Sequence, residues 1–223
     1  MNDPLEELRA QFAGYCAATG RGEHVFSLRP DAAALLVVDM QRFVCAPTDG
    51  RRLPGIERII ATINTLADGC RRRGVPVIWL RQSFNTRDGA DDAGLYRAFH
   101  KAPLSPLLFD QGPDTEIFEG MHFDQVRDHV VFKNRYSAFA KGASRLEEVL
   151  QRLGVGQLWM TGVATNACVE STARDAMQRD YEVVMVEDGM IAAFELVHQV
   201  LLMNFRAFYG DVRPAKDILA LLP

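Results

Sequence analysis

Short, unbroken runs of apolar residues recur along the chain and alternate with segments of helical periodicity. A strand that helices cover on both faces is apolar at every position, so it shows as a continuous run rather than as an alternating pattern. Five segments have this character and are predicted as strands, namely 32–39, 75–80, 129–132, 157–162 and 182–188. The pattern therefore indicates a largely buried parallel sheet.

Apolar residues at helical spacing predict helices between these strands. The predicted helices are 4–16, 54–73, one that carries Leu146 to Leu153 and ends at Gly154, one whose first turn holds Cys168, 194–208 and 215–222. Strands that alternate with helices favour a three-layer α/β/α, doubly wound parallel fold. Scattered Gly and Pro residues break the pattern over 82–128, and so long an irregular excursion suggests a functional role.

Composition narrows the class of protein. The chain is 48% hydrophobic and 24% charged with a net charge of −4, which is ordinary for a globular protein and disfavours disorder and nucleic-acid binding. Its longest apolar run, 32–38, is far shorter than the about 20 residues of a membrane span. The acidic N-terminus lacks a secretory pattern, so we expect a cytoplasmic protein. We expect an extension at 1–30 followed by a single domain at 31–223.

The cysteines and histidines show no ligand spacing. Cys16, Cys45, Cys70 and Cys168 contain no Cys-x-x-Cys pair, so neither a disulfide framework nor a structural zinc site is predicted. The histidines are His24, His100, His122, His129 and His198. We expect each to be a surface or hydrogen-bonded residue rather than a metal ligand.

Three reactive side chains follow predicted strands, where doubly wound sheets bind ligands. Taken singly, Asp39 could be a helix cap or an ion-pair partner, Lys133 a solvated strand end, and Cys168 a small buried residue. Together they can perform acyl transfer. The thiol attacks as a thiolate, and a helix start and a nearby cation are expected to lower its pKa. Asp39 can take the thiol proton and return it to the leaving nitrogen.

Three segments carry a resemblance to the isochorismatase-like cysteine hydrolase superfamily. They are LLVVDMQ (35–41), FKNRYSAF (132–139) and TGVATNACVESTARDA (161–176), and the similarity covers about residues 31 to 213. The resemblance implies that Asp39, Lys133 and Cys168 form a catalytic triad. It also implies an oxyanion hole from the N–H groups of Ala164 and Cys168, and a cis peptide between Val163 and Ala164.

The same resemblance implies a six-stranded parallel sheet, assembly as a homo-oligomer (a dimer or tetramer), and no organic cofactor. Departures from the family patterns narrow the substrate. Isochorismatases proper lack the nucleophilic cysteine, so Cys168 disfavours vinyl ether cleavage. Nicotinamidases carry an Asp-x-His for a metal, and this sequence has no Asp-x-His, so nicotinamide and a bound metal are disfavoured.

The remaining expectation is an amidohydrolase that splits a linear C–N bond of a small amide, ureido or carbamoyl compound through a thioester. Within the third segment, the ATNACVESTARD stretch resembles the ureidoacrylate type. Alternatives are a maleamate-like, nicotinamide-like or cyclic lactam substrate, or a non-catalytic binding protein, against which the intact triad counts. Nucleic acid and membranes are not expected as partners.

Side chains adjacent to the triad in the sequence are candidates for the substrate pocket. They are Gln41, Phe43, Arg81, Gln82, Tyr136, Phe139 and Asn166. Aromatic rings could exclude water, and the amides and Arg81 could hold a ureido group or a carboxylate. Their structural alternatives are packing, surface solvation and helix capping.

Overall fold

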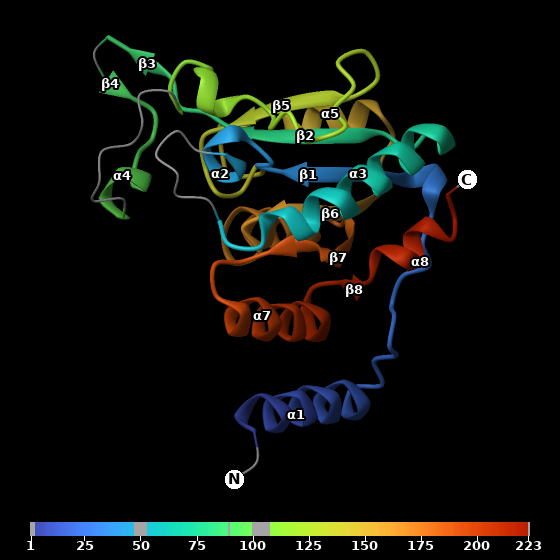
Figure 1. Cartoon of the computed structure of the whole chain (residues 1–223). Helices are drawn as coiled ribbons and strands as arrows, with labels where there is room; N and C mark the ends of the chain where they lie inside the picture. Colours follow the sequence, from blue (N-terminus) through green and yellow to red (C-terminus); the bar gives the residue numbers. More distant parts are fainter. Residues whose placement is uncertain (1–2, 47–52, 89, 100–107, 223) are drawn as a thin grey trace.

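A computed structural model describes residues 3–46, 53–88, 90–99 and 108–222. Its main sheet has six parallel strands in the order β5–β2–β1–β6–β7–β8. The strands are β1 (Ala33–Val38), β2 (Val77–Gln82), β5 (His129–Lys133), β6 (Gln157–Val163), β7 (Glu182–Ile191) and β8 (Asp211–Arg213). Figure 1 shows helices on both sides of the sheet, which confirms the predicted doubly wound α/β fold.

The apolar runs are explained by two cores, one on each face of the sheet. In β1, Ala34, Leu36 and Val38 pack into one core, and Ala33, Leu35 and Val37 into the other. The first core also holds residues of α5 (Leu146–Arg152), α6 (Glu170–Met177) and α7 (Glu195–Phe208). The second holds residues of α3 (Ile56–Arg73) and α8 (Ala215–Leu219). Both faces of β1 are therefore dry, which is why its sequence does not alternate.

Strand β8 is absent from the pattern-based prediction. It is three residues long and polar at both ends, where Asp211 accepts hydrogen bonds from the backbone N–H groups of Val25 (2.8 Å) and Phe26 (3.1 Å). A short strand of this composition produces no apolar run. The irregular excursion contains the hairpin β3 (Thr86–Arg87) and β4 (Ala90–Asp91), the short helix α4 (Tyr96–Phe99) and the 3₁₀ turn η3 (Pro113–Thr115).

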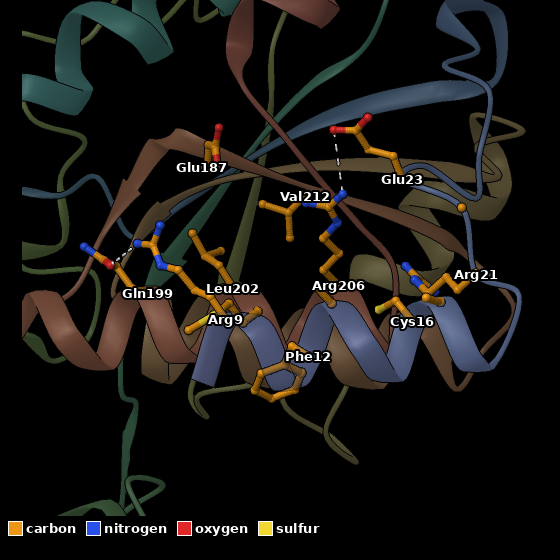
Figure 2. A pocket seen from close by; sticks show the side chains of 14 residues that line it. Arg9, Phe12, Cys16, Arg21, Glu23, Glu187, Gln199, Leu202, Arg206 and Val212 are labelled. Carbon is orange, nitrogen blue, oxygen red and sulfur yellow. Dashed lines mark hydrogen bonds and ion pairs between the residues drawn. The ribbon is translucent and has the colours of Figure 1, made fainter. Parts of the chain in front are cut away.

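The N-terminal helix α1 (Pro4–Ala18) lies outside the layers, beside α7 (Figure 1). The Asp3 carboxylate caps it by accepting from the Leu5 N–H at 3.0 Å. A cavity of about 550 Å³ lies beside α1 and α7 and is lined in part by Arg9, Phe12 and Arg206 (Figure 2). No helix in the described part of the chain is long and apolar enough to span a membrane.

Gly162 allows the central strands β1 and β6 to meet closely at their carboxyl ends. Its φ is +101°, and a Cβ built on it would lie 2.1 Å from the Val38 carbonyl oxygen and 2.6 Å from the Val38 nitrogen. These contacts are with backbone, so neither neighbour can move aside at low cost. A side chain at this position would therefore push apart the two strand ends that carry Asp39 and Val163.

We predict that Gly162→Ala destabilises the fold by about 3 kcal/mol or more, because a backbone clash adds to an unfavourable φ. Urea unfolding followed by circular dichroism measures the change. Gly154→Ala is the matched control, since Gly154 also has a positive φ (+67°) but nothing lies within 4 Å of a Cβ built on it. Gly154→Ala is expected to lower the free energy of unfolding by only about 1–2 kcal/mol. Equal losses in the two variants would contradict the close-contact argument.

Candidate active site

The structure brings Asp39, Lys133 and Cys168 together at the carboxyl edge of the sheet. Asp39 directly follows β1 and has a left-handed backbone conformation (φ 51°). Its N–H donates to the Leu80 carbonyl at 3.0 Å. Lys133 is the last residue of β5. Cys168 lies in η4 (Thr165–Val169), a π-helical turn that leads into α6, rather than in the first turn of a regular helix.

Lys133 contacts both of the other two residues. Its Nζ lies 2.9 Å from Asp39 Oδ2 and 3.2 Å from Cys168 Sγ. It also donates to Gln82 Oε1 at 2.7 Å and to the Arg135 carbonyl at 3.2 Å. The exposed fraction is 1% for Lys133, 3% for Asp39 and 9% for Cys168. The three groups thus interact in a nearly dry environment, where electrostatic interactions are strong.

The pKa of the Cys168 thiol is raised to about 12, mainly by burial and next by the negative charge of Asp39. Lys133 acts in the opposite direction but does not compensate. The sequence-based expectation of a lowered thiol pKa is therefore wrong. The pKa is raised because the effects of burial and of the Asp39 carboxylate together exceed the opposite effect of the Lys133 ammonium. At neutral pH the Cys168 side chain is therefore a protonated thiol.

Lys133 stays positively charged in spite of its burial. Burial by itself lowers the pKa of Lys133, but the charges of Asp39 and Cys168 and their hydrogen bonds raise it above its ordinary value. A buried ammonium is tolerated only when it is paired and hydrogen-bonded in this way. The site therefore combines a fixed cation, a carboxylate and a neutral thiol.

A pocket of about 420 Å³ opens beside the thiol. Asp39, Gln82 and Cys168 are among its polar lining residues. Its other described lining residues are Phe43, Val44, Leu53, Pro54, Tyr96, Tyr136, Val163, Ala164 and Ala167. Three residues that we predicted from the sequence, Phe43, Gln82 and Tyr136, are thus part of the lining. Tyr96 was missed because it belongs to the irregular excursion, where no periodicity points to the strand ends.

Two of the predicted pocket residues, Gln41 and Arg81, are buried elsewhere. The Gln41 side chain bonds to the backbone of Gln82 and to the carbonyl of Thr115. Arg81 donates from Nε to the same carbonyl at 2.6 Å, and it pairs with Glu116 at 3.0 Å. Both side chains thus fasten the excursion to the sheet, and neither is among the pocket-lining residues.

The structure also places Phe139 and Asn166 away from the pocket lining. The Phe139 ring is buried in a core, 5.8 Å from the ring of Tyr181, with the Arg179 guanidinium over it. Asn166 is exposed although it is two residues before the nucleophile, because the π-helical turn directs it to the surface. Adjacency in sequence therefore does not place a side chain in the pocket.

The turn before Cys168 contains the cis peptide that the resemblance implied. The Val163–Ala164 peptide is cis, and Ala164 and Cys168 both line the pocket. Gly162, immediately before this peptide, is the residue that contacts the Val38 backbone. The turn therefore presents Ala164 and Cys168 to the same space.

The described residues contain no group of three or more His, Cys, Asp and Glu side chains that could hold a metal ion. The His198 Nδ1 lies 2.9 Å from the Thr165 hydroxyl, and the His122 Nδ1 lies 2.7 Å from Asp68. His100 lies outside the described residues. The placed histidines with these partners thus have hydrogen-bonding roles.

Comparisons with known proteins are consistent with this geometry. Residues 33–217 match the Isochorismatase domain model. Nicotinamidase 3 of Arabidopsis thaliana is 34% identical over 174 residues, which cover 77% of this chain and 79% of that protein. The ureidoacrylate amidohydrolase RutB of Pseudomonas syringae pv. syringae is 31% identical over 207 residues, which cover 85% of this chain and 83% of that protein. The structure of a cysteine hydrolase from Pseudomonas syringae pv. phaseolicola aligns with a TM-score of 0.81 at 27% identity, over 90% of this chain and 96% of that one.

We predict opposite effects of the two charged neighbours on alkylation of Cys168 by iodoacetamide. Asp39→Asn removes the negative charge that raises the thiol pKa, so alkylation at neutral pH becomes faster, roughly tenfold for each unit by which the pKa falls. Lys133→Met removes the cation that lowers the pKa, so alkylation becomes slower. Peptide mass spectrometry over a pH series measures both rates.

Cys16, on α1 and outside the site, is the internal control in each variant, and its alkylation rate is expected to stay constant. Circular dichroism checks that each variant is folded. Equal Cys168 rates in the wild type and both variants would show that neither charge acts on the thiol.

Proposed function

The chain belongs to the isochorismatase family, and on this basis we propose that it is a cysteine-dependent amidohydrolase. Its reaction is hydrolysis of a linear C–N bond in a small amide, ureido or carbamoyl compound, with release of ammonia or an amine. One observation carries the proposal: Lys133 contacts both the Asp39 carboxylate and the Cys168 sulfur at the edge of a small pocket. An acid, a cation and a nucleophile in this arrangement have complementary roles in acyl transfer.

The first half of the reaction forms a thioester. Asp39 takes the thiol proton while the sulfur attacks the carbonyl carbon, so the carbonyl oxygen becomes an oxyanion. The N–H groups of Ala164 and Cys168 bind this oxyanion, and one such hydrogen bond is typically worth about 3 kcal/mol. Protonated Asp39 then gives its proton to the leaving nitrogen, the C–N bond breaks, and ammonia or the amine departs.

The second half returns the enzyme to its resting state. Asp39 removes a proton from a water molecule, whose oxygen attacks the thioester carbon. The C–S bond breaks, the carboxylic acid product is released, and the sulfur recovers the proton from Asp39. Lys133 keeps its charge throughout and stabilises the sulfur whenever it is anionic, which offsets the high thiol pKa of the resting site.

Phe43, Gln82 and Tyr136 are the substrate contacts that we propose from the predicted set, because they line the pocket. We do not propose the other four as substrate contacts. The side chains of Gln41 and Arg81 are hydrogen-bonded to backbone groups, Phe139 is packed in a core, and Asn166 is exposed at the surface. The relative named ureidoacrylate amidohydrolase supports a ureido substrate. A nicotinamide-like amide is the second candidate, supported by the relative named Nicotinamidase 3. We also propose a homo-oligomer as the working assembly.

We predict that Cys168→Ala abolishes hydrolysis, with a fall in kcat of roughly 10⁴-fold or more, because the nucleophile is lost while the small residue keeps the turn. The measurement is release of ammonia or amine from a panel of ureido acids, N-carbamoyl amino acids and neutral carboxamides, together with the unfolding temperature.

Cys16→Ala is the matched control, since it removes a thiol on α1 far in the sequence from the pocket turn, and it is expected to keep full activity. Full turnover by Cys168→Ala, with an unchanged unfolding temperature, would rule out a thioester route.

A further inference from the structure

The carboxamide of Gln82 has one satisfied end and one free end. Its Oε1 accepts a hydrogen bond from Lys133 Nζ at 2.7 Å. Because an ammonium can only donate, the oxygen must be the atom that faces Lys133, and this defines the orientation of the amide. Its Nε2 is buried and has no hydrogen-bond partner among the described residues. Gln82 is only 3% exposed and lines the pocket.

The backbone of Gln82 is held as firmly as its side chain. Gln41 Oε1 accepts from the Gln82 N–H at 2.7 Å, and Gln41 Nε2 donates to the Gln82 carbonyl at 3.0 Å and to the Thr115 carbonyl at 2.7 Å. Gln41 is completely buried. Gln82 therefore cannot turn easily to find another partner for its free N–H group, and Gln41 is a positioning residue for it.

A second unpaired polar atom, of opposite character, belongs to another residue of the pocket lining. Asp39 Oδ1 is buried and also lacks a hydrogen-bond partner among the described residues. Buried polar groups are nearly always satisfied, and leaving one unpaired is costly. Two residues of the pocket lining thus carry one unpaired donor and one unpaired acceptor, which a ligand of matching chemistry would satisfy.

Our proposed reaction leaves a specific task for the Gln82 donor. The scissile carbonyl oxygen is directed to the N–H groups of Ala164 and Cys168, and the leaving nitrogen to Asp39. A donor cannot bind the N–H groups of the leaving amine. The remaining partner for Gln82 Nε2 is a hydrogen-bond acceptor elsewhere on the acyl side of the substrate.

We propose that Gln82 selects small amides that carry a second acceptor, such as another carbonyl oxygen, one or two atoms from the scissile carbonyl. The inference rests on the proposed function and names its substrate class. Phe43, Tyr96 and Tyr136 supply aromatic walls, so the rest of the substrate is compact and flat or apolar. Acyl ureas and dicarbonyl amides belong to this class, and simple aliphatic amides do not.

Malonamide and isovaleramide test this selectivity, because they have the same number of heavy atoms and only malonamide has a second carbonyl. Binding is measured by NMR titration to Cys168→Ala, which cannot turn over. We expect malonamide to bind roughly tenfold more tightly or better, since a buried hydrogen bond distinguishes the two. Equal binding, or no detectable binding of malonamide, would overturn the proposal.

Two further substitutions in the same background separate selection from anchoring of Lys133. Gln82→Glu keeps an oxygen for Lys133 and removes the N–H donor, whereas Gln82→Met removes both. We expect the preference for malonamide to disappear in both variants. If the preference for malonamide disappears in Gln82→Met but not in Gln82→Glu, Gln82 only anchors Lys133 and the proposal is overturned. Gln151→Glu, on the exposed face of α5, is the matched control and is expected to keep the preference.

Hydrolysis by the unmodified enzyme tells the two proposals apart. If binding shows the preference but no amide of the panel is hydrolysed, the role of Gln82 stands and the amidohydrolase proposal fails. If amides are hydrolysed with no difference between the two probes in binding or in kcat/KM, the amidohydrolase proposal stands and the role of Gln82 fails.

Discussion

The buried ion pair between Lys133 and Asp39 is the contact on which the rest of the site depends. Removing two charges from water is costly unless each gains a close partner. β5 is separated from β1 by β2 in the sheet, so Lys133 must reach past the intervening strand end to meet Asp39. Gln82 is the last residue of β2 and is paired in register with Lys133. Its Oε1 accepts a hydrogen bond from the Lys133 ammonium.

The same ion pair sets the protonation of the nucleophile. Asp39 raises the pKa of Cys168 and Lys133 lowers it, and burial decides the balance in favour of the neutral thiol. In the reaction we propose, the carboxylate that disfavours the thiolate is also the base that removes the thiol proton, so ionisation and attack are coupled. This arrangement differs from sites in which a helix start and a cation hold a thiolate permanently. In the proposed reaction, Lys133 stabilises the sulfur only while it is anionic.

Strands and site residues differ in how far the sequence predicts them. Apolar runs locate five strands of the main sheet because both faces of each are covered, whereas the short polar β8 leaves no such trace. Asp39, Lys133 and Cys168 are predictable because each lies at or shortly after the end of a strand, and these strand ends lie at a common edge. Gln41 closely follows β1 and Arg81 lies near the end of β2, but hydrogen bonds to Thr115, in an irregular segment, direct both side chains away from the pocket. The thiol pKa depends on burial and on three-dimensional distances, which no spacing encodes.

The high pKa of the Cys168 thiol has a consequence for its sensitivity to oxidation. Peroxides attack thiolates far faster than thiols, and oxidation to sulfenic and sulfinic acids follows thiolate character and exposure. A nucleophile that is 9% exposed and neutral between turnovers is a poor target for such oxidants. The burial that raises the thiol pKa thus also slows oxidation of the sulfur.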